Sequence, residues 1–208
     1  MRGRVKISYN APVILSFVLL CFVVTLIGEI TGEKSTGMFF AVYRGALSDP
    51  MTYIRCFTHV LGHAGFDHFI GNAMLLLLVG PMLEEKYGSG AMLKVILATA
   101  GLTGVLHCLL WSNTALCGAS GIVFACIILS SFAAVKDKEI PLTLILVAVL
   151  YLGKEVYSGI LIQDNVANLM HIFGGVVGCV SGFTEQKQMT CFRHEKVQKW
   201  FYEMMRSA

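Results

Sequence analysis

Long apolar segments alternate with short polar ones along the whole chain. Six of them, nearly free of charged residues, run over residues 11–27, 68–83, 92–111, 120–135, 140–153 and 166–183. A helix needs about 20 apolar residues to cross the hydrocarbon core of a membrane. The segments approach that length except for 140–153, whose 14 residues span roughly 21 Å. The pattern predicts an all-α, polytopic membrane protein with six transmembrane helices.

One uncharged stretch needs a turn in its middle. No charged residue occurs between Val95 and Val135, which is too long for one membrane span. The sequence WSNTALCGAS, at residues 111–120, contains the turn-forming residues that divide the stretch into two helices. Ser120 therefore opens the fourth helix.

Composition agrees with a membrane protein. The 208 residues are 56% hydrophobic and only 14% charged, with a mean hydropathy of +0.71, whereas soluble domains carry about a quarter charged residues. The net charge of +3 and the lack of a basic, aromatic patch argue against nucleic-acid binding. The seven cysteines contain no CxxC pair and lie mostly in apolar runs, so neither a disulfide framework nor a zinc site is predicted.

The distribution of Lys and Arg predicts the orientation. Both ends of the chain and the loop at 136–139 are richer in these residues than the alternate loops, which places both termini in the cytoplasm. We expect a cytoplasmic N-terminus at 1–10, one six-helix domain at 11–185 and a cytoplasmic tail at 186–208. The tail is either an amphipathic surface helix or solvated chain. Segment 11–27 is expected to be a retained helix rather than a cleaved signal peptide. A bacterial plasma membrane is favoured over an internal eukaryotic one.

Four polar side chains from three helices are predicted to share one depth. Counted from the charge at the inner end of each helix, Ser120 and His68 lie roughly 24 Å up. His171 and Asn72 lie roughly 21 and 18 Å up. Polar groups inside a membrane are costly, and scattered ones would not be expected to converge on one layer. We therefore interpret this layer as a site.

The residue types suit nucleophilic catalysis. Ser120 opens a helix, where free backbone N–H groups favour an anion, and His171 is the expected general base. His68 and Asn72 project from one helix face as donors for an oxyanion. No acid shares the layer, so the arrangement is a dyad. The small residues Gly174, Gly175, Gly178 and Gly182 face Gly121 and Ala125, which predicts close packing of the fourth and sixth helices.

Two other interpretations of these polar residues compete with nucleophilic catalysis. The histidines in HVLGHAGFDH, His59, His63 and His68, could form a metal site, but they lack the glutamate of HExxH and a third ligand of certain geometry. We expect no metal and no cofactor. Polar groups at one depth could also line the path of a small transporter, although none of the six segments carries a charge at its centre.

The chain resembles the rhomboid family of intramembrane serine proteases. Four blocks match in the family's order: RCFTHVLGHAGFDHFIGN at residues 55–72, LEEKYGSG at 83–90, GASG at 118–121, and His171 with Gly174 and Gly178. The resemblance implies a six-helix rhomboid-like bundle with a membrane-embedded first loop. It implies hydrolysis of peptide bonds in or near transmembrane helices of other proteins. A catalytically silent relative that binds membrane proteins is the alternative.

The resemblance also implies roles for individual residues. Ser120 is implied as nucleophile and His171 as base, with His68, Asn72 and the Ser120 N–H holding the oxyanion. Phe124 matches a position that often carries a tyrosine packed on the histidine. Arg55 matches the arginine of a Trp-Arg loop pair whose tryptophan position is Ile54 here, a departure that bears on how the first loop is anchored. Substrate identity, cleavage site and oligomeric state are not implied.

Overall fold

The computed structural model describes residues 8–132, 142, 145, 146, 149, 150, 153, 166 and 168–185. Eight of the 14 residues of the predicted fifth segment lie outside these residues, as do residues 1–7 and the tail from 186. Within the described part every regular element is a helix, and the only extended pairing is the isolated bridge between Val42 and Leu116. The predicted all-α membrane bundle is confirmed.

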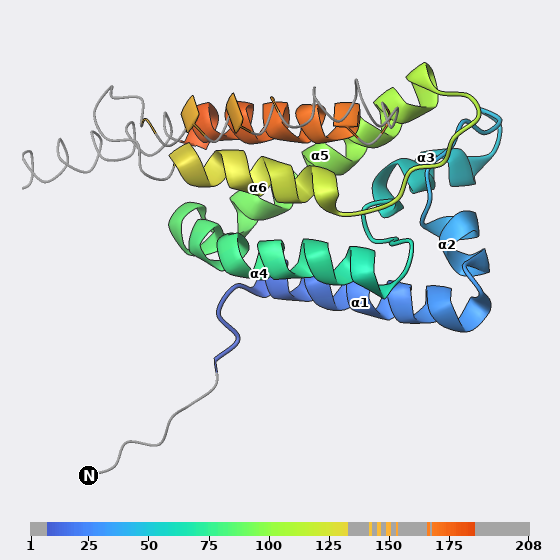
Figure 1. Cartoon of the computed structure of the whole chain (residues 1–208), viewed down its shortest axis with the longest axis horizontal. Helices are drawn as coiled ribbons and strands as arrows, with labels where there is room; N and C mark the ends of the chain where they lie inside the picture. Colours follow the sequence, from blue (N-terminus) through green and yellow to red (C-terminus); the bar gives the residue numbers. More distant parts are fainter. Residues whose placement is uncertain are drawn as a thin grey trace, which may run out of the picture.

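Four labelled helices correspond to predicted apolar segments. They are α1 (Pro12–Thr31), α4 (Phe66–Tyr87), α5 (Ser89–Leu110) and α6 (Ser120–Phe132). Within the described residues α1, α4 and α5 are long and apolar enough to cross a membrane, and α6 is a shorter apolar helix. Residues 168–185 form a further helix in the predicted sixth segment. In Figure 1, α1 and α4 run along one side of the bundle, and α6 and the 168–185 helix run along the other.

The first loop, which connects α1 to α4, contains two helices that the hydrophobic pattern does not predict. They are α2 (Lys34–Phe39) and α3 (Pro50–Thr58), which gather at one end of the bundle (Figure 1). Helix α3 begins where Asp49 accepts a hydrogen bond from the Met51 N–H at 2.9 Å, with Pro50 in the first turn, a combination that favours helix initiation. Helix α1 also runs four residues beyond its predicted end at residue 27 and stops at Gly32, whose φ is +60°.

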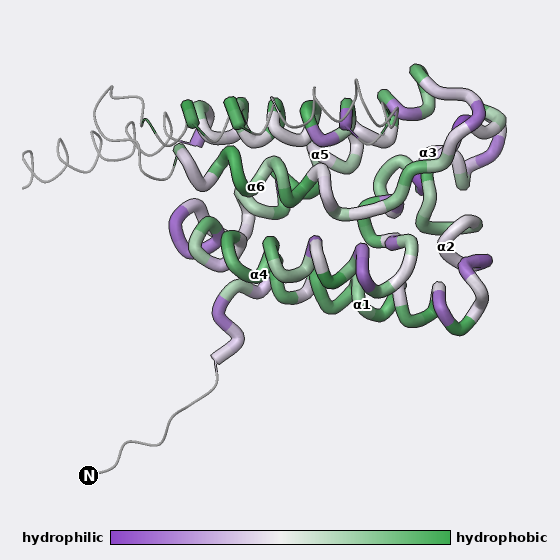
Figure 2. The backbone as a smooth tube through the Cα atoms, in the orientation of Figure 1, coloured by the Kyte–Doolittle hydropathy of each residue, from purple (hydrophilic) through white to green (hydrophobic). Residues whose placement is uncertain are grey.

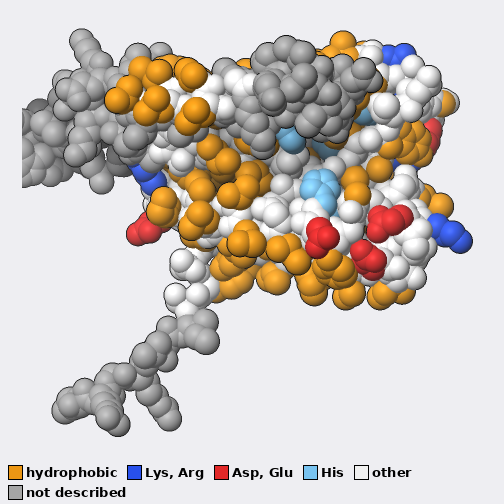
Figure 3. Space-filling model, viewed as in Figure 1, with side chains coloured by type: hydrophobic (Ala, Val, Ile, Leu, Met, Phe, Trp, Pro, Cys, Tyr) orange, Lys and Arg blue, Asp and Glu red, His pale blue; other side chains and the backbone are white. Residues whose placement is uncertain are grey.

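The surface of the described helices is suited to lipid. Apolar stretches follow the helices in Figure 2, and polar stretches lie at their ends and in the loops. Hydrophobic side chains cover the face over α1 and α4 in Figure 3, and acidic side chains gather near the end that carries the first loop. Large exposed side chains on α1 include Leu19, Leu20 and Ile30. The chain is therefore an integral membrane protein, and its apolar exterior faces lipid.

Helices α1 and α4 pack closely at the end opposite the first loop. A Cβ at Gly80 would lie 2.8 Å from the side chain of Ile14, so this glycine admits α1. One turn later, the buried carboxylate of Glu84 accepts hydrogen bonds from the Val13 and Ile14 N–H groups, both at 2.9 Å. Glu84 thereby satisfies donors that the first turn of a helix leaves unpaired.

Candidate functional site

Ser120 and His171 meet at the end of the bundle that carries the first loop. Ser120 is the first residue of α6, and its Oγ lies 2.8 Å from Nε2 of His171 on the 168–185 helix. Both side chains are half-buried. The distance is that of a hydrogen bond between a hydroxyl and an imidazole. The structure thus brings together the two residues that their depth predicts should meet.

Glycine contacts set the separation of the two helices. A Cβ at Gly174 would lie 2.9 Å from the Cα of Gly121, and a Cβ at Gly178 would lie 2.9 Å from the Cα of Ala125. Real Cβ atoms do not tolerate such distances. The backbones therefore touch along two successive turns below Ser120 and His171, as the small-residue pattern predicts.

The turn before Ser120 has a backbone shape that requires glycine. Gly118 has φ +132°, and a Cβ there would lie 2.8 Å from Cε1 of His68. Its N–H donates to the His59 carbonyl at 3.0 Å. The next residue, Ala119, donates its N–H to Nε2 of His63 at 3.4 Å. Two residues of the first loop therefore hold the turn that presents Ser120.

His68 and Asn72 lie on α4 beside that turn. Both side chains face the position that a Gly118 side chain would occupy, with Asn72 Nδ2 3.9 Å from it. Asn72 is buried, and its Nδ2 has no hydrogen-bond partner among the described residues. A buried amide donor without a partner is uncommon and calls for an explanation.

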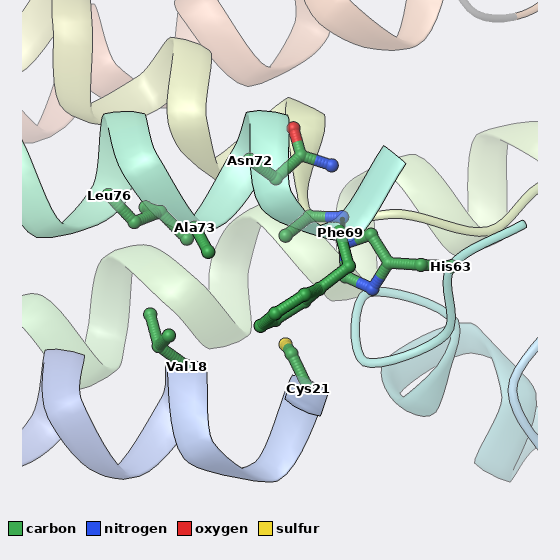
Figure 4. A pocket seen from close by; sticks show the side chains of 8 residues that line it. Val18, Cys21, His63, Phe69, Asn72, Ala73 and Leu76 are labelled. Atoms are coloured by element: carbon green, nitrogen blue, oxygen red, sulfur yellow. Dashed lines mark hydrogen bonds between the residues drawn. The ribbon is translucent and has the colours of Figure 1, made fainter. Parts of the chain in front are cut away.

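Apolar side chains pack behind Asn72 and His63. Val18 and Cys21 of α1 and Phe69, Ala73 and Leu76 of α4 line a small pocket there (Figure 4). Phe69 extends toward α1, whereas the Asn72 amide points away from it. His63 also meets the ring of Phe69 edge-on, with centroids 5.6 Å apart. The polar edge of the site is therefore backed by packed hydrocarbon.

Phe124 contacts the His171 ring from one turn below Ser120. The ring centroids are 4.6 Å apart and tilted by 43°, within the range of favourable aromatic pairs. The contact expected at this position is therefore made by a phenyl ring.

Arg55 anchors the first loop without a neighbouring tryptophan. Its guanidinium pairs with Asp49 at 3.2 Å, donates to the Met38 carbonyl at 3.2 Å, and lies 4.2 Å from the centre of the Tyr43 ring. Ile54, at the tryptophan position, is 48% exposed. The loop is therefore held by the arginine and its partners, and Ile54 leaves these contacts intact.

His59 and His63 of the HVLGH sequence make contacts of their own within the protein. His59 Nε2 lies 3.2 Å from Thr103 Oγ1, and His63 Nδ1 lies 3.2 Å from the Leu61 carbonyl. No group of three potential ligands occurs among the described residues. Burial lowers the pKa of His59 to about 4, and burial, followed by the charge of His68, lowers the pKa of His63 to about 4. Both rings are therefore neutral near pH 7.

Two contacts add to what the sequence pattern indicates. The sequence pattern suggests His63 only as a possible metal ligand. Its position four residues after His59, in HVLGH, was the signal that could have indicated its burial. His107 donates from Nε2 to the Thr114 carbonyl at 3.0 Å and stacks on Trp111. It thereby contacts the loop that precedes Ser120.

Comparison with known proteins identifies a family. The family model described as Rhomboid domain matches residues 50–188. The chain is 29% identical over 166 residues to Rhomboid protease GluP of Bacillus subtilis, covering 77% of the chain and 31% of that protein. It is 25% identical to Rhomboid protease GlpG of Serratia proteamaculans, covering 86% of the chain and 65% of that protein. Against GlpG of Haemophilus influenzae the identity is 25%, with 87% and 94% covered. The chain thus spans about a third of the first relative and just under two thirds of the second.

Proposed function

The chain belongs to the rhomboid family, and on that premise we propose that it is an intramembrane serine endopeptidase. Its substrates are other membrane proteins, cut in or near a transmembrane helix. The observation that carries the proposal is the 2.8 Å contact between Ser120 Oγ and His171 Nε2, at the amino end of an apolar helix. The names of the relatives as proteases support the same activity.

Ser120 is the proposed nucleophile and His171 the proposed base. Ser120 Oγ attacks the scissile carbonyl while His171 Nε2 takes the hydroxyl proton. The same imidazolium then gives its proton to the leaving amine, which frees one product and leaves an acyl group on Ser120. Water attacks the acyl group with His171 again as base. No carboxylate is required in this scheme, which fits the absence of an acid from the predicted layer.

The oxyanion is assigned to donors that surround the turn at Gly118. The Ser120 N–H belongs to the first turn of α6, where backbone donors are unpaired. Asn72 Nδ2, which has no partner in the part of the chain that the structure describes, and the adjacent His68 ring complete the set. Donors placed before the charge develops are the most effective in stabilising a transition state. The role assigned to Asn72 accounts for its unsatisfied amide.

Substrate access follows from the chemistry of a helix. A transmembrane helix holds its carbonyls in internal hydrogen bonds, so it must unwind locally before Ser120 reaches one. We propose small or helix-breaking residues near the cut. We also propose the orientation that the Lys and Arg distribution predicts. In it both termini are cytoplasmic, and Ser120 lies below the outer surface of a bacterial plasma membrane.

The test is cleavage of a model transmembrane substrate by the full chain in liposomes. We expect cleavage by wild type and none by Ser120→Ala. Ser130→Ala is the matched control, because the Ser130 hydroxyl donates to the Ile127 carbonyl at 2.7 Å on the same helix. Cleavage that persists in Ser120→Ala would contradict the proposal, and binding of the substrate without cleavage by wild type would favour a silent relative.

A further inference from the structure

We infer that Cys56 and Cys108 form a redox-active thiol pair, whose oxidation to a disulfide joins the first loop covalently to α5. Cys56 lies in α3, and Cys108 lies in the last turn of α5. The inference concerns the first loop and does not depend on protease activity. The spacing of the cysteines in the sequence predicts no such pair, so the proposal rests on the positions of α3 and α5.

The backbones of α3 and α5 touch next to the two cysteines. A Cβ at Gly104 would lie 2.6 Å from the Cα of Cys56. Cys108 follows Gly104 by four residues, so it lies on the same face of α5, roughly 6 Å further along the helix. Together with the gap between α3 and α5, that offset puts the two Cα atoms near the upper limit of the 4.4–6.8 Å that a disulfide usually requires.

Both thiols face the seam between the first loop and α5. The Cys108 Sγ donates to the Tyr43 carbonyl of the first loop at 3.6 Å, and the Cys56 Sγ donates to the Thr52 carbonyl at 3.3 Å. Burial raises the pKa of Cys56 to about 11, and the Cys108 thiol adds to the rise through its charge and a side-chain hydrogen bond. The two thiols therefore lie along the same seam between the first loop and α5.

The seam holds its position through other contacts. Arg44 of the first loop donates from Nε to the Cys108 carbonyl at 2.6 Å and also donates to the Leu109 carbonyl. In Figure 1 the short helices of the first loop and the end of α5 lie at the same end of the molecule. The predicted orientation puts this end on the outer side of the membrane, where disulfides form and persist.

The oxidant is a disulfide, such as oxidised glutathione. The Cys108 thiol is half-buried whereas Cys56 is 7% exposed, so Cys108 loses its proton and attacks the oxidant first. This step forms a mixed disulfide and releases one thiol. The Cys56 thiolate then attacks the Cys108 sulfur, which forms the internal disulfide and releases a second thiol. The two cysteine protons end on the two released thiols, and the oxidant takes up two electrons.

The test is differential alkylation of the purified full chain in liposomes. After treatment with oxidised glutathione, remaining thiols are blocked with a maleimide, the protein is reduced, and newly exposed thiols receive a second label. We expect Cys56 and Cys108 to lose the first label together and gain the second together. A peptide containing both residues, joined and two hydrogens lighter, should appear before reduction.

Single cysteine variants distinguish a disulfide between Cys56 and Cys108 from oxidation of other cysteines. Cys56→Ser and Cys108→Ser should each abolish the joined peptide, whereas Cys179→Ser on the 168–185 helix should retain it. Oxidation should also raise the melting temperature of wild type but of neither pair variant, because a cross-link restricts the unfolded chain. Independent alkylation of Cys56 and Cys108 after oxidation, or a stable glutathione adduct on Cys108 beside free Cys56, would overturn the inference.

Discussion

Two helix interfaces in this molecule are built in opposite ways. Between α6 and the 168–185 helix, backbone lies against backbone, through Gly174 on Gly121 and Gly178 on Ala125. Between α1 and α4, the Ile14 side chain lies against Gly80, and Glu84 caps the amino end of α1. A glycine contact leaves almost no freedom in the helix separation, whereas interdigitated side chains can readjust. We infer that the first interface fixes the distance from Ser120 to His171, and that the second mainly supplies stability.

The largest effect on activity should follow enlargement of the glycine contacts. We expect Gly174→Ala to push the helices apart and lower kcat by roughly 100-fold, because small misplacements of reacting groups are that costly. Gly178→Ala should have a smaller effect, since it lies one turn further from Ser120. The measurement is the rate of substrate cleavage in liposomes.

Gly71→Ala is the matched control for this prediction. Gly71 lies on α4, and nothing lies within 4 Å of the position that its Cβ would take. Cleavage by this variant should stay close to wild type. Equal rates for Gly71→Ala and Gly174→Ala would show that the tight interface does not set the dyad distance.

Removing the carboxylate of Glu84 should affect stability more than catalysis. Glu84→Gln weakens two hydrogen bonds to backbone N–H groups and one from the Ser89 hydroxyl at 2.7 Å. We expect the free energy of unfolding to fall by about 2–3 kcal/mol, with kcat little changed at temperatures where the variant is folded. Thermal unfolding in detergent measures this.

Ser89→Ala provides the graded comparison, because it removes only one of the three partners. Its loss of stability should be smaller, about 1 kcal/mol. If Glu84→Gln instead lowered kcat as strongly as Gly174→Ala without lowering the melting temperature, the division between the two interfaces would be wrong.

Acid should destabilise the first loop through its buried histidines. The folded pKa of His63 is about 4 against an ordinary 6.5, with burial as the main cause. The unfolded chain therefore binds more protons between about pH 6.5 and 4, and the free energy of unfolding falls as the pH falls through that window. His59 has the same shift and adds to the effect.

His63→Gln tests this cause. An amide oxygen can still accept the Ala119 N–H but does not titrate in this range, so activity at pH 7 should largely remain and the acid loss of melting temperature should shrink. His63→Leu offers no acceptor and should lower kcat at pH 7 with KM little changed. An unchanged acid loss in His63→Gln would assign the pH dependence to other groups.

The smallest effect is expected at Phe124. Aromatic pairs contribute about 0.5–1.5 kcal/mol beyond burial, so Phe124→Leu should lower kcat roughly two- to tenfold. Phe124→Tyr keeps the ring against His171 and should cleave at nearly the wild-type rate. A larger loss in Phe124→Tyr than in Phe124→Leu would mean that ring packing is not what this residue provides.

The sequence predicts features that depend on fixed helix geometry. The apolar segments locate α1, α4, α5 and α6, and helix rise places Ser120 and His171 at a common depth, because each residue advances a helix by a constant distance. The helices α2 and α3 are missed because neither is a long apolar run, which is the pattern that locates the other helices. For α3 the pair Asp49-Pro50 was a usable start signal.

Contacts between distant segments are the part that the pattern does not predict. Glu84 caps a helix that begins some seventy residues earlier, and α5 packs on α3 and the first loop near Cys56 and Cys108, although the whole of α4 separates them in the sequence. His63 reaches the turn before Ser120 only after the first loop has folded. These pairings depend on tertiary packing, and no local periodicity encodes them.

The most direct measurement is the site of covalent labelling by a serine-directed fluorophosphonate, mapped by mass spectrometry. We predict an adduct on Ser120 in wild type and in Ser130→Ala, a strong loss of labelling in His171→Ala, and no adduct in Ser120→Ala. Labelling that is equal in wild type and His171→Ala, or that falls on another serine, would contradict the assignment of Ser120 and His171 as nucleophile and base.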